Sequence, residues 1–159
     1  MPASQSQLEL RGFSVRSFEL ASNANYQHES PSIGTLSVDY EVFVNEDDLL
    51  EFQLVMPVKI ADRTTLHETN EPYALQVSAV GLFRFAAGTD DDLIARMVHL
   101  NAPAMLYGLV RGYVAQTTAN AENGTYLLPV FNFVQLRKSK LVPPKSQAEP
   151  LLDAPTASE

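Results

Sequence analysis

Histidine and carboxylate side chains are the groups in this chain that could bind a metal ion or move a proton. His28 and His67 lie in polar segments with no second ligand at a suitable spacing, and His99 follows Arg96 in a helical stretch. None belongs to an HExxH pattern or to another metal-binding pattern. The 159-residue chain has no cysteine, so thiolate catalysis, cysteine metal ligation and disulfides are excluded. The three histidines are expected to lie in solvent or at the edge of the core.

Two acidic runs, residues 45–48 and 90–92, offer the other candidate ligands. Neither has the twelve-residue spacing of a calcium-binding loop. The first has the length of a hairpin turn. The second follows Thr89, a predicted N-cap, and carboxylates stabilise the first turn of a helix. Because phosphate-binding glycine loops and GxSxG are also absent, the chain is expected to be no enzyme and to use no metal or cofactor.

Composition narrows the function classes further. The formal net charge is −8, which argues against nucleic acid and anionic membrane surfaces as partners. Hydrophobic residues make up 45% of the chain, as expected for one globular domain. The start has no signal-peptide pattern and no apolar run approaches the roughly 20 residues of a membrane span. We therefore expect a cytoplasmic protein with a flexible N-terminus at 1–7, a domain at 8–142 and a disordered tail at 143–159.

Period-two alternation predicts four strands, at residues 8–20, 35–44, 49–60 and 73–85. Gly12 indicates a bend or bulge in the first strand. Pro57 has no N–H for a ladder, so it indicates an edge position or a bulge in the third. Simple alternation places Phe13 and Phe18 on opposite faces of the first strand.

Helical spacing of apolar residues follows the fourth strand. The sequence Asn101-Ala102-Pro103 predicts either a kink or the end of one helix and the start of another. Gly108 and Gly112, four residues apart, either permit close approach of a second helix or are merely tolerated. Residues 125–136 fit either a fifth strand or the beginning of a last helix. Strands first and helices later predict an α+β fold, an antiparallel sheet with helices on one face.

An apolar surplus remains after the core is assigned. The closing run adds Tyr126, Phe131 and Phe133 to the aromatic residues of the first strand. A sheet covered by helices on one face buries only that face, so the remaining apolar groups need a partner. They indicate either a groove for apolar peptide segments or an ordinary core with a homo-oligomer interface.

Three segments together resemble the SecB family of export chaperones. They are the strand 73–85 with its Val-Gly-Leu-Phe, the helix start Asn101-Ala102-Pro103 through Arg111, and the run 124–133 ending in Leu-Pro-Val-Phe-Asn-Phe. The resemblance covers about residues 8–136. It implies a four-stranded antiparallel sheet with a long helix and a short C-terminal helix on one face. Protomers of that family pair their sheets, and dimers pack through the long helices into a homotetramer.

The resemblance also implies a function and a set of sites. The protein would hold unfolded client polypeptides without ATP, for export, in apolar grooves. The implied client-binding residues are Phe18, Leu75, Val77, Phe131 and Phe133. The implied oligomer interface comprises Leu106, Gly108, Leu109, Gly112 and Tyr113. Contact with the translocation ATPase SecA would fall on Glu19, Ala74 and Gln76.

The chain departs from the family pattern at the implied SecA contact. Glu19 matches one of the expected carboxylates, but Gln76 and Val15 stand where two more are expected. SecB-like chaperones also serve toxin–antitoxin systems, so a chaperone or interaction module dedicated to one client, such as an antitoxin, is the alternative. A small-ligand protein or enzyme on a similar fold would need a deep pocket with convergent polar groups, and the apolar faces offer few.

Overall fold

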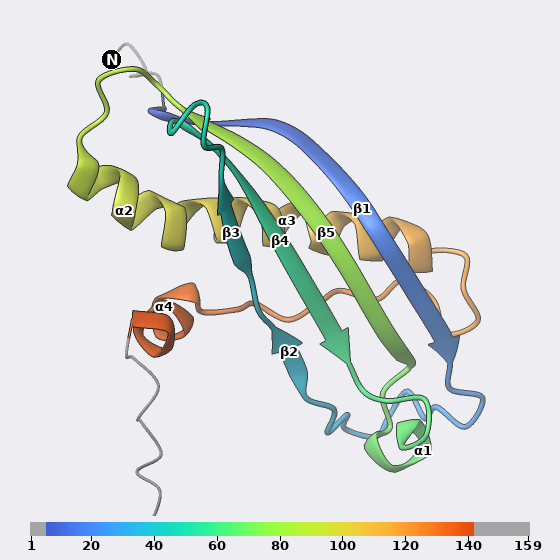
Figure 1. Cartoon of the computed structure of the whole chain (residues 1–159). Coiled ribbons are helices and arrows are strands. Elements are labelled where there is room, and N and C mark those ends of the chain that lie inside the picture. The colour runs from blue at the N-terminus through green and yellow to red at the C-terminus, as the bar shows by residue number, and fades with distance from the viewer. Residues whose placement is uncertain (1–5, 142–159) are drawn as a thin grey trace, which may run out of the picture.

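The computed structural model describes residues 6–141 (Figure 1). Most of the expected flexible N-terminus and the whole expected tail at 143–159 lie outside the described residues. The strands are β1 (Leu8–Ser22), β2 (Leu36–Val38), β3 (Glu41–Val44), β4 (Glu51–Ile60) and β5 (Tyr73–Phe85). The helices are α1 (Leu66–Thr69), α2 (Asp91–His99), α3 (Asn101–Thr118) and α4 (Phe133–Leu141).

All strand pairs are antiparallel, in the order β1-β5-β4, and β2 and β3 both pair with β4. Helices α2 and α3 cross behind the sheet and α4 lies beside the β2–β3 edge (Figure 1). The face turned toward α3 is apolar, because alternate residues of β4 and β5 are buried there. They include Phe52, Leu54, Met56, Val58, Leu75, Val77, Ala79 and Phe83, with exposed fractions of 0–3%. The α+β prediction is confirmed, with five strands in place of four.

Two β-bulges in β1 change which of its side chains face the core. The register skips Arg11 and Arg16, so both are extra residues in the strand. Phe13 consequently pairs with Gly81 and Phe18 with Val77, positions that share one face of β5. The expectation that Phe13 and Phe18 lie on opposite faces is therefore wrong, since the bulge at Arg16 restores the parity between them.

The predicted strand at 35–44 is divided into β2 and β3 by a break at Asp39–Tyr40. The two pieces keep one register on β4, with Val38 opposite Val58 and Glu41 opposite Val55. Pro57 lies opposite the break; its carbonyl accepts from the Asp39 N–H at 3.2 Å, but it has no N–H to return. The expectation that Pro57 marks an edge position or a bulge is therefore wrong, because β4 is a central strand without a bulge at this residue. The N–H that Pro57 lacks interrupts the neighbouring strand at Asp39–Tyr40 instead.

The helical segment breaks at Leu100, whose backbone (φ −122°, ψ −59°) separates α2 from α3. Asp90 is the N-cap of α2, and its carboxylate accepts from the Leu93 N–H at 3.3 Å. Within the described residues, the run Asp91–Thr118 is long and apolar enough to cross a membrane by length and composition alone. A core helix passes the same test, and α3 buries Leu106, Val110 and others within this domain.

Polar contacts fasten the loop after α3 to the end of the sheet. The Asn123 side chain donates to the carbonyls of Asn23 and Pro72, at 3.0 and 2.8 Å. Glu71 is 5% exposed, and its carboxylate accepts from the Gly34 N–H at 3.1 Å and from the Tyr126 hydroxyl at 3.2 Å. Residues 125–132 then return along α3 without joining the sheet, so they form neither a fifth strand nor a helix. The last helix, α4, begins only at Phe133.

Candidate functional site

Aromatic rings from four segments meet where the C-terminal run returns to the sheet. Phe131 and Phe133 lie 4.9 Å apart between ring centroids, and Tyr107 of α3 lies 6.0 and 5.7 Å from them. Tyr40, in the break between β2 and β3, lies 6.4 Å from Phe133. We call Tyr40, Tyr107, Phe131 and Phe133 the aromatic cluster. It joins α3, the β2–β3 break and the start of α4.

Side chains of α3 hold the returning segment in place through its backbone. The Tyr107 hydroxyl donates to the Pro129 carbonyl at 2.6 Å, and Arg111 Nε donates to the Leu128 carbonyl at 2.9 Å. Burial raises the pKa of Tyr107 to about 12, with the Arg111 charge acting in the opposite direction, so the phenol remains a donor at neutral pH. These two bonds hold the Leu128 and Pro129 carbonyls against α3, while the neighbouring Leu127 and Val130 side chains are 67% and 85% exposed.

Large apolar side chains near this cluster are open to solvent. Val130 is 85% exposed and Val134 50%, and on the edge strand β3 Phe43 and Val44 are 50% and 54% exposed. A hollow of about 450 Å³ lies between β3 and α4, lined by Tyr40, Glu41, Val42, Phe43, His99 and Lys140. We call this hollow, with the aromatic cluster beside it, the edge groove. In the described residues β3 pairs only with β4, so its outer backbone edge is available to an extended peptide.

The predicted client-binding residues fall into two groups. Phe131 and Phe133 belong to the aromatic cluster of the edge groove. Leu75 and Val77 are only 2% and 0% exposed and form the core beneath the helices. Phe18 packs edge-to-face on Tyr113 of α3, with centroids 5.4 Å apart. Of these residues, Phe131 is half-buried, whereas Phe133, Leu75 and Val77 are buried.

The predicted oligomer-interface residues lie on two sides of α3. Leu106 is 0% exposed and packs in the core of its own protomer, so it is not available to a second copy. Leu109 is 37% exposed, and a Cβ built on Gly108 or Gly112 meets no atom within 4 Å. Tyr113 is half-buried against Phe18. The open part of α3 is thus a stripe of Met105, Gly108, Leu109 and Gly112.

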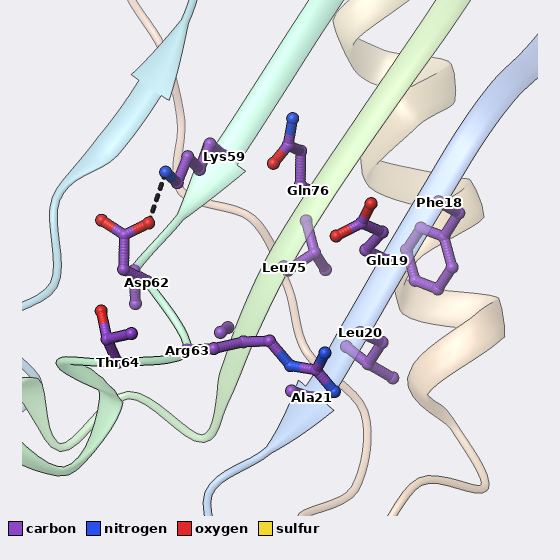
Figure 2. Close-up of a pocket in the computed structure, with 12 residues that line it drawn as sticks. Phe18, Glu19, Leu20, Ala21, Lys59, Asp62, Arg63, Thr64, Leu75 and Gln76 are labelled. Carbon is purple, nitrogen blue, oxygen red and sulfur yellow. Dashed lines mark ion pairs between the residues drawn. The ribbon is translucent and has the colours of Figure 1, made fainter.

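The predicted partner-binding residues gather on the opposite, outer face of the sheet. A hollow of about 620 Å³ there is lined by Glu19, Ala74 and Gln76, and by Lys59, Asp62 and Arg63 among others (Figure 2). The register aligns Glu19, Gln76 and Lys59 in one row across β1, β5 and β4, and Lys59 pairs with Asp62. This row carries one carboxylate, one amide and one ammonium group, so it is not a uniformly acidic surface.

Val15 does not belong to that outer face. It pairs with Ala79 and packs against the core, because the bulge at Arg16 sets its side chain toward α3. The expectation of an acidic position there is therefore wrong for this chain, and Ser14 and Ser17 occupy the neighbouring outward positions opposite Val80 and Ser78.

Residues 6–141 contain no group of three or more His, Asp or Glu side chains that could hold a metal ion. His99 alone of the three histidines joins a buried network, with Nδ1 3.0 Å from the Tyr40 hydroxyl. Sequence analysis missed Tyr40 and Lys140 as site residues, since each is unremarkable in its own segment and they meet only in the fold.

The geometry defines an α+β protein with a helix-backed antiparallel sheet and an open apolar groove suited to extended polypeptide. A family profile described as preprotein translocase subunit SecB matches residues 3–142. The chain belongs to the SecB family. The resemblance inferred from the three sequence segments is thereby confirmed.

One solved structure, a SecB-like chaperone, shares this fold. The Mycobacterium tuberculosis Rv1957 SecB-like chaperone, solved in complex with a ChAD peptide from the Rv1956 HigA1 antitoxin, is 14% identical with a TM-score of 0.57. The match covers 79% of this chain and 91% of that chain. A protein of unknown function from Streptococcus agalactiae is 10% identical with a TM-score of 0.41, over 80% of this chain and 100% of that one. A search of the curated proteins finds no match.

Proposed function

We propose that this protein is an ATP-independent holding chaperone of the cytoplasm, which binds unfolded preproteins in the edge groove and keeps them competent for export. Its membership of the SecB family supports a chaperone role. The observation that carries the site is the hollow between β3 and α4, with the aromatic cluster beside it and with an edge of β3 that pairs with no other strand in the described residues.

The groove offers a client two kinds of interaction. The free edge of β3 presents backbone N–H and C=O groups that pair with any extended chain, whatever its sequence. The apolar side chains add about 25 cal/mol for each Å² that the client covers. Binding of this kind favours exposed apolar segments of unfolded chains, and it withdraws them from aggregation by mass action. No covalent step or turnover is required.

Assembly into a homotetramer is the accompanying proposal. The long strand β1 pairs only with β5 in the described residues, and its other edge can pair with a second copy. The stripe on α3 has room for a second helix at Gly108 and Gly112. Together these two surfaces support a dimer formed through the sheets and a tetramer formed through α3.

The proposed contact with SecA has weaker support than the client groove. Glu19 lines the outer-face hollow and keeps its carboxylate exposed, but Gln76 beside it is neutral and Lys59 is basic. We propose Glu19, Ala74 and Gln76 as the contact if this chain delivers clients to SecA. Glu19→Lys should then abolish SecA binding while client binding persists; unchanged SecA affinity would exclude this face.

The test is aggregation suppression combined with a mass measurement. The purified protein is added without nucleotide to a denatured, slowly folding substrate, and light scattering is followed over time. A tetramer in solution that suppresses aggregation at one tetramer per substrate supports the proposal. A protein that leaves aggregation unchanged at a tenfold excess refutes a general holding function.

A chaperone dedicated to one client, such as an antitoxin, is the second candidate. It is favoured by one observation, that the structurally similar Rv1957 chaperone was solved with an antitoxin peptide. A panel of unrelated unfolded proteins separates the two candidates. A general chaperone binds most of the panel with similar Kd values, whereas a dedicated one binds a single member tightly and the others weakly.

A further inference from the structure

Lys140 connects helix α4 to the sheet edge. The Lys140 ammonium lies 2.6 Å from Asp39 Oδ1 and donates to the Tyr40 carbonyl at 2.7 Å. It also lies 4.6 Å from the centroid of the Tyr40 ring, within range of a cation–π contact. Asp39 and Tyr40 occupy the break between β2 and β3, so three contacts from one side chain join α4 to that break.

The same tyrosine contacts the end of α2. The Tyr40 hydroxyl lies 3.0 Å from His99 Nδ1, and the two ring centroids are 5.9 Å apart. Tyr40 is 1% exposed, and it is therefore held between the lysine of α4 and the histidine of α2. A change in the charge of His99 therefore acts next to Tyr40, the residue that Lys140 of α4 contacts.

Cations outnumber carboxylates around His99. Arg137 and Lys140 face it from α4, and Asp39, from the β2–β3 break, is already paired with Lys140. Glu41 of β3 lines the same hollow. On its own helix, Arg96 lies in the last turn.

Burial and the charges of Arg137 and Lys140 lower the pKa of His99 below its ordinary value. A proton added to His99 places a third positive charge beside these two. Arg137 Nε is buried without a hydrogen-bond partner in the described part of the chain, so no neutralising contact at that atom offsets the added charge.

We propose that Asp39, Tyr40, His99 and Lys140 form a proton-controlled clasp, which holds α4 against the sheet edge while His99 is neutral and releases α4 when His99 is protonated. Release withdraws Lys140 from Tyr40 and uncovers the Tyr40 ring of the edge groove. The consequence for clients rests on the proposed function, but the clasp itself does not.

The direction of the pH effect follows from the lowered pKa. A folded-state pKa of His99 below about 6.5 means that docked α4 binds fewer protons than released α4. Docking is therefore strongest above pH 6.5 and weakens as the pH falls through the folded-state pKa. For Asp39, burial raises the pKa, but hydrogen bonds from Lys140 and the Tyr40 N–H and the Lys140 charge lower it overall. Its carboxylate thus stays charged in that window.

The chain has no cysteine, so Lys138→Cys on the exposed side of α4 provides a single site for a nitroxide spin label. Electron paramagnetic resonance of the full-length protein is recorded from pH 7.5 to 4.5, with far-UV circular dichroism at each pH. We expect an immobilised label at pH 7.5 and a growing mobile fraction below pH 6.5 at constant secondary structure. In Lys140→Met the label should be mobile already at pH 7.5.

His99→Asn tests the proton directly, because asparagine can accept the Tyr40 hydrogen bond but cannot acquire a charge. Its label should stay immobilised down to pH 4.5, while His67→Asn, at an exposed histidine, should keep the wild-type transition. A label that is insensitive to pH in the wild type, or a transition that survives in His99→Asn, overturns the clasp. Client affinity measured in parallel is a separate readout: failure to bind clients at any pH, with the label transition intact, rejects the proposed function and leaves the clasp standing.

Discussion

Phe43 provides a sharp test of the edge groove, because it is accessible yet anchored on β3. Its side chain is 50% exposed, so a bound client can cover about half of it. Full burial of a phenylalanine contributes about 1.5–3 kcal/mol, and half of that is about 0.8–1.5 kcal/mol. Phe43→Ala should therefore weaken the Kd for an extended client segment about 4- to 12-fold.

The assay is fluorescence anisotropy with a labelled, unstructured client peptide at fixed salt, and urea unfolding reports the stability of each variant. Leu82→Ala is the matched control. Leu82 is 42% exposed and, with Phe43, lines a separate hollow of about 300 Å³ near Gln53, but it does not line the edge groove. Equal losses in both variants would place the client on the outer face of the sheet. An unchanged Kd in folded Phe43→Ala would refute the reasoning altogether.

Three further changes test the fold around the site. Glu71→Ala removes a buried carboxylate that accepts two hydrogen bonds, and it should lower the free energy of unfolding by about 2–4 kcal/mol in urea titration; a loss under 0.5 kcal/mol would show that water replaces it. The double change Gly108→Ala and Gly112→Ala should stabilise the protomer by about 1–2 kcal/mol in total and reduce the tetramer fraction in sedimentation, unless α3 is not the interface. Asp90→Ala removes the cap of α2 and should cost about 0.5–2 kcal/mol in thermal unfolding, with no change expected if Thr89 takes over the cap.

Strands and helices were predictable where one local rule decides the structure. The strict alternation in β4 and β5 and the helical spacing after Asp90 correspond to elements of the structure. The division of residues 35–44 was not predictable from that segment, because its cause, Pro57, lies on the next strand. Likewise, nothing in the local alternation of β1 shows that Arg11 and Arg16 are extra residues; the register against β5 decides it.

Only part of the candidate site was predictable from the sequence. The apolar surplus that includes Phe131 and Phe133 indicated either a peptide groove or a homo-oligomer interface, and the structure brings the two rings together with Tyr107. The alternation that singled out Leu75 and Val77 cannot distinguish a groove wall from a core, since both require apolar residues on one face. Lys140 and Tyr40 are 100 residues apart, so only the folded chain brings them together.

The two bulges of β1 make its length adjustable at two places. Each bulge adds one residue without a partner on β5, so deleting Arg11 or Arg16 would straighten the strand and leave every other side chain on its present face. Deleting Ser14 instead would move the side chains between that point and the next bulge to the opposite face of the sheet. Related chains can therefore gain or lose a residue at positions 11 and 16 while keeping the same core, and alignments of this strand should allow gaps there before anywhere else.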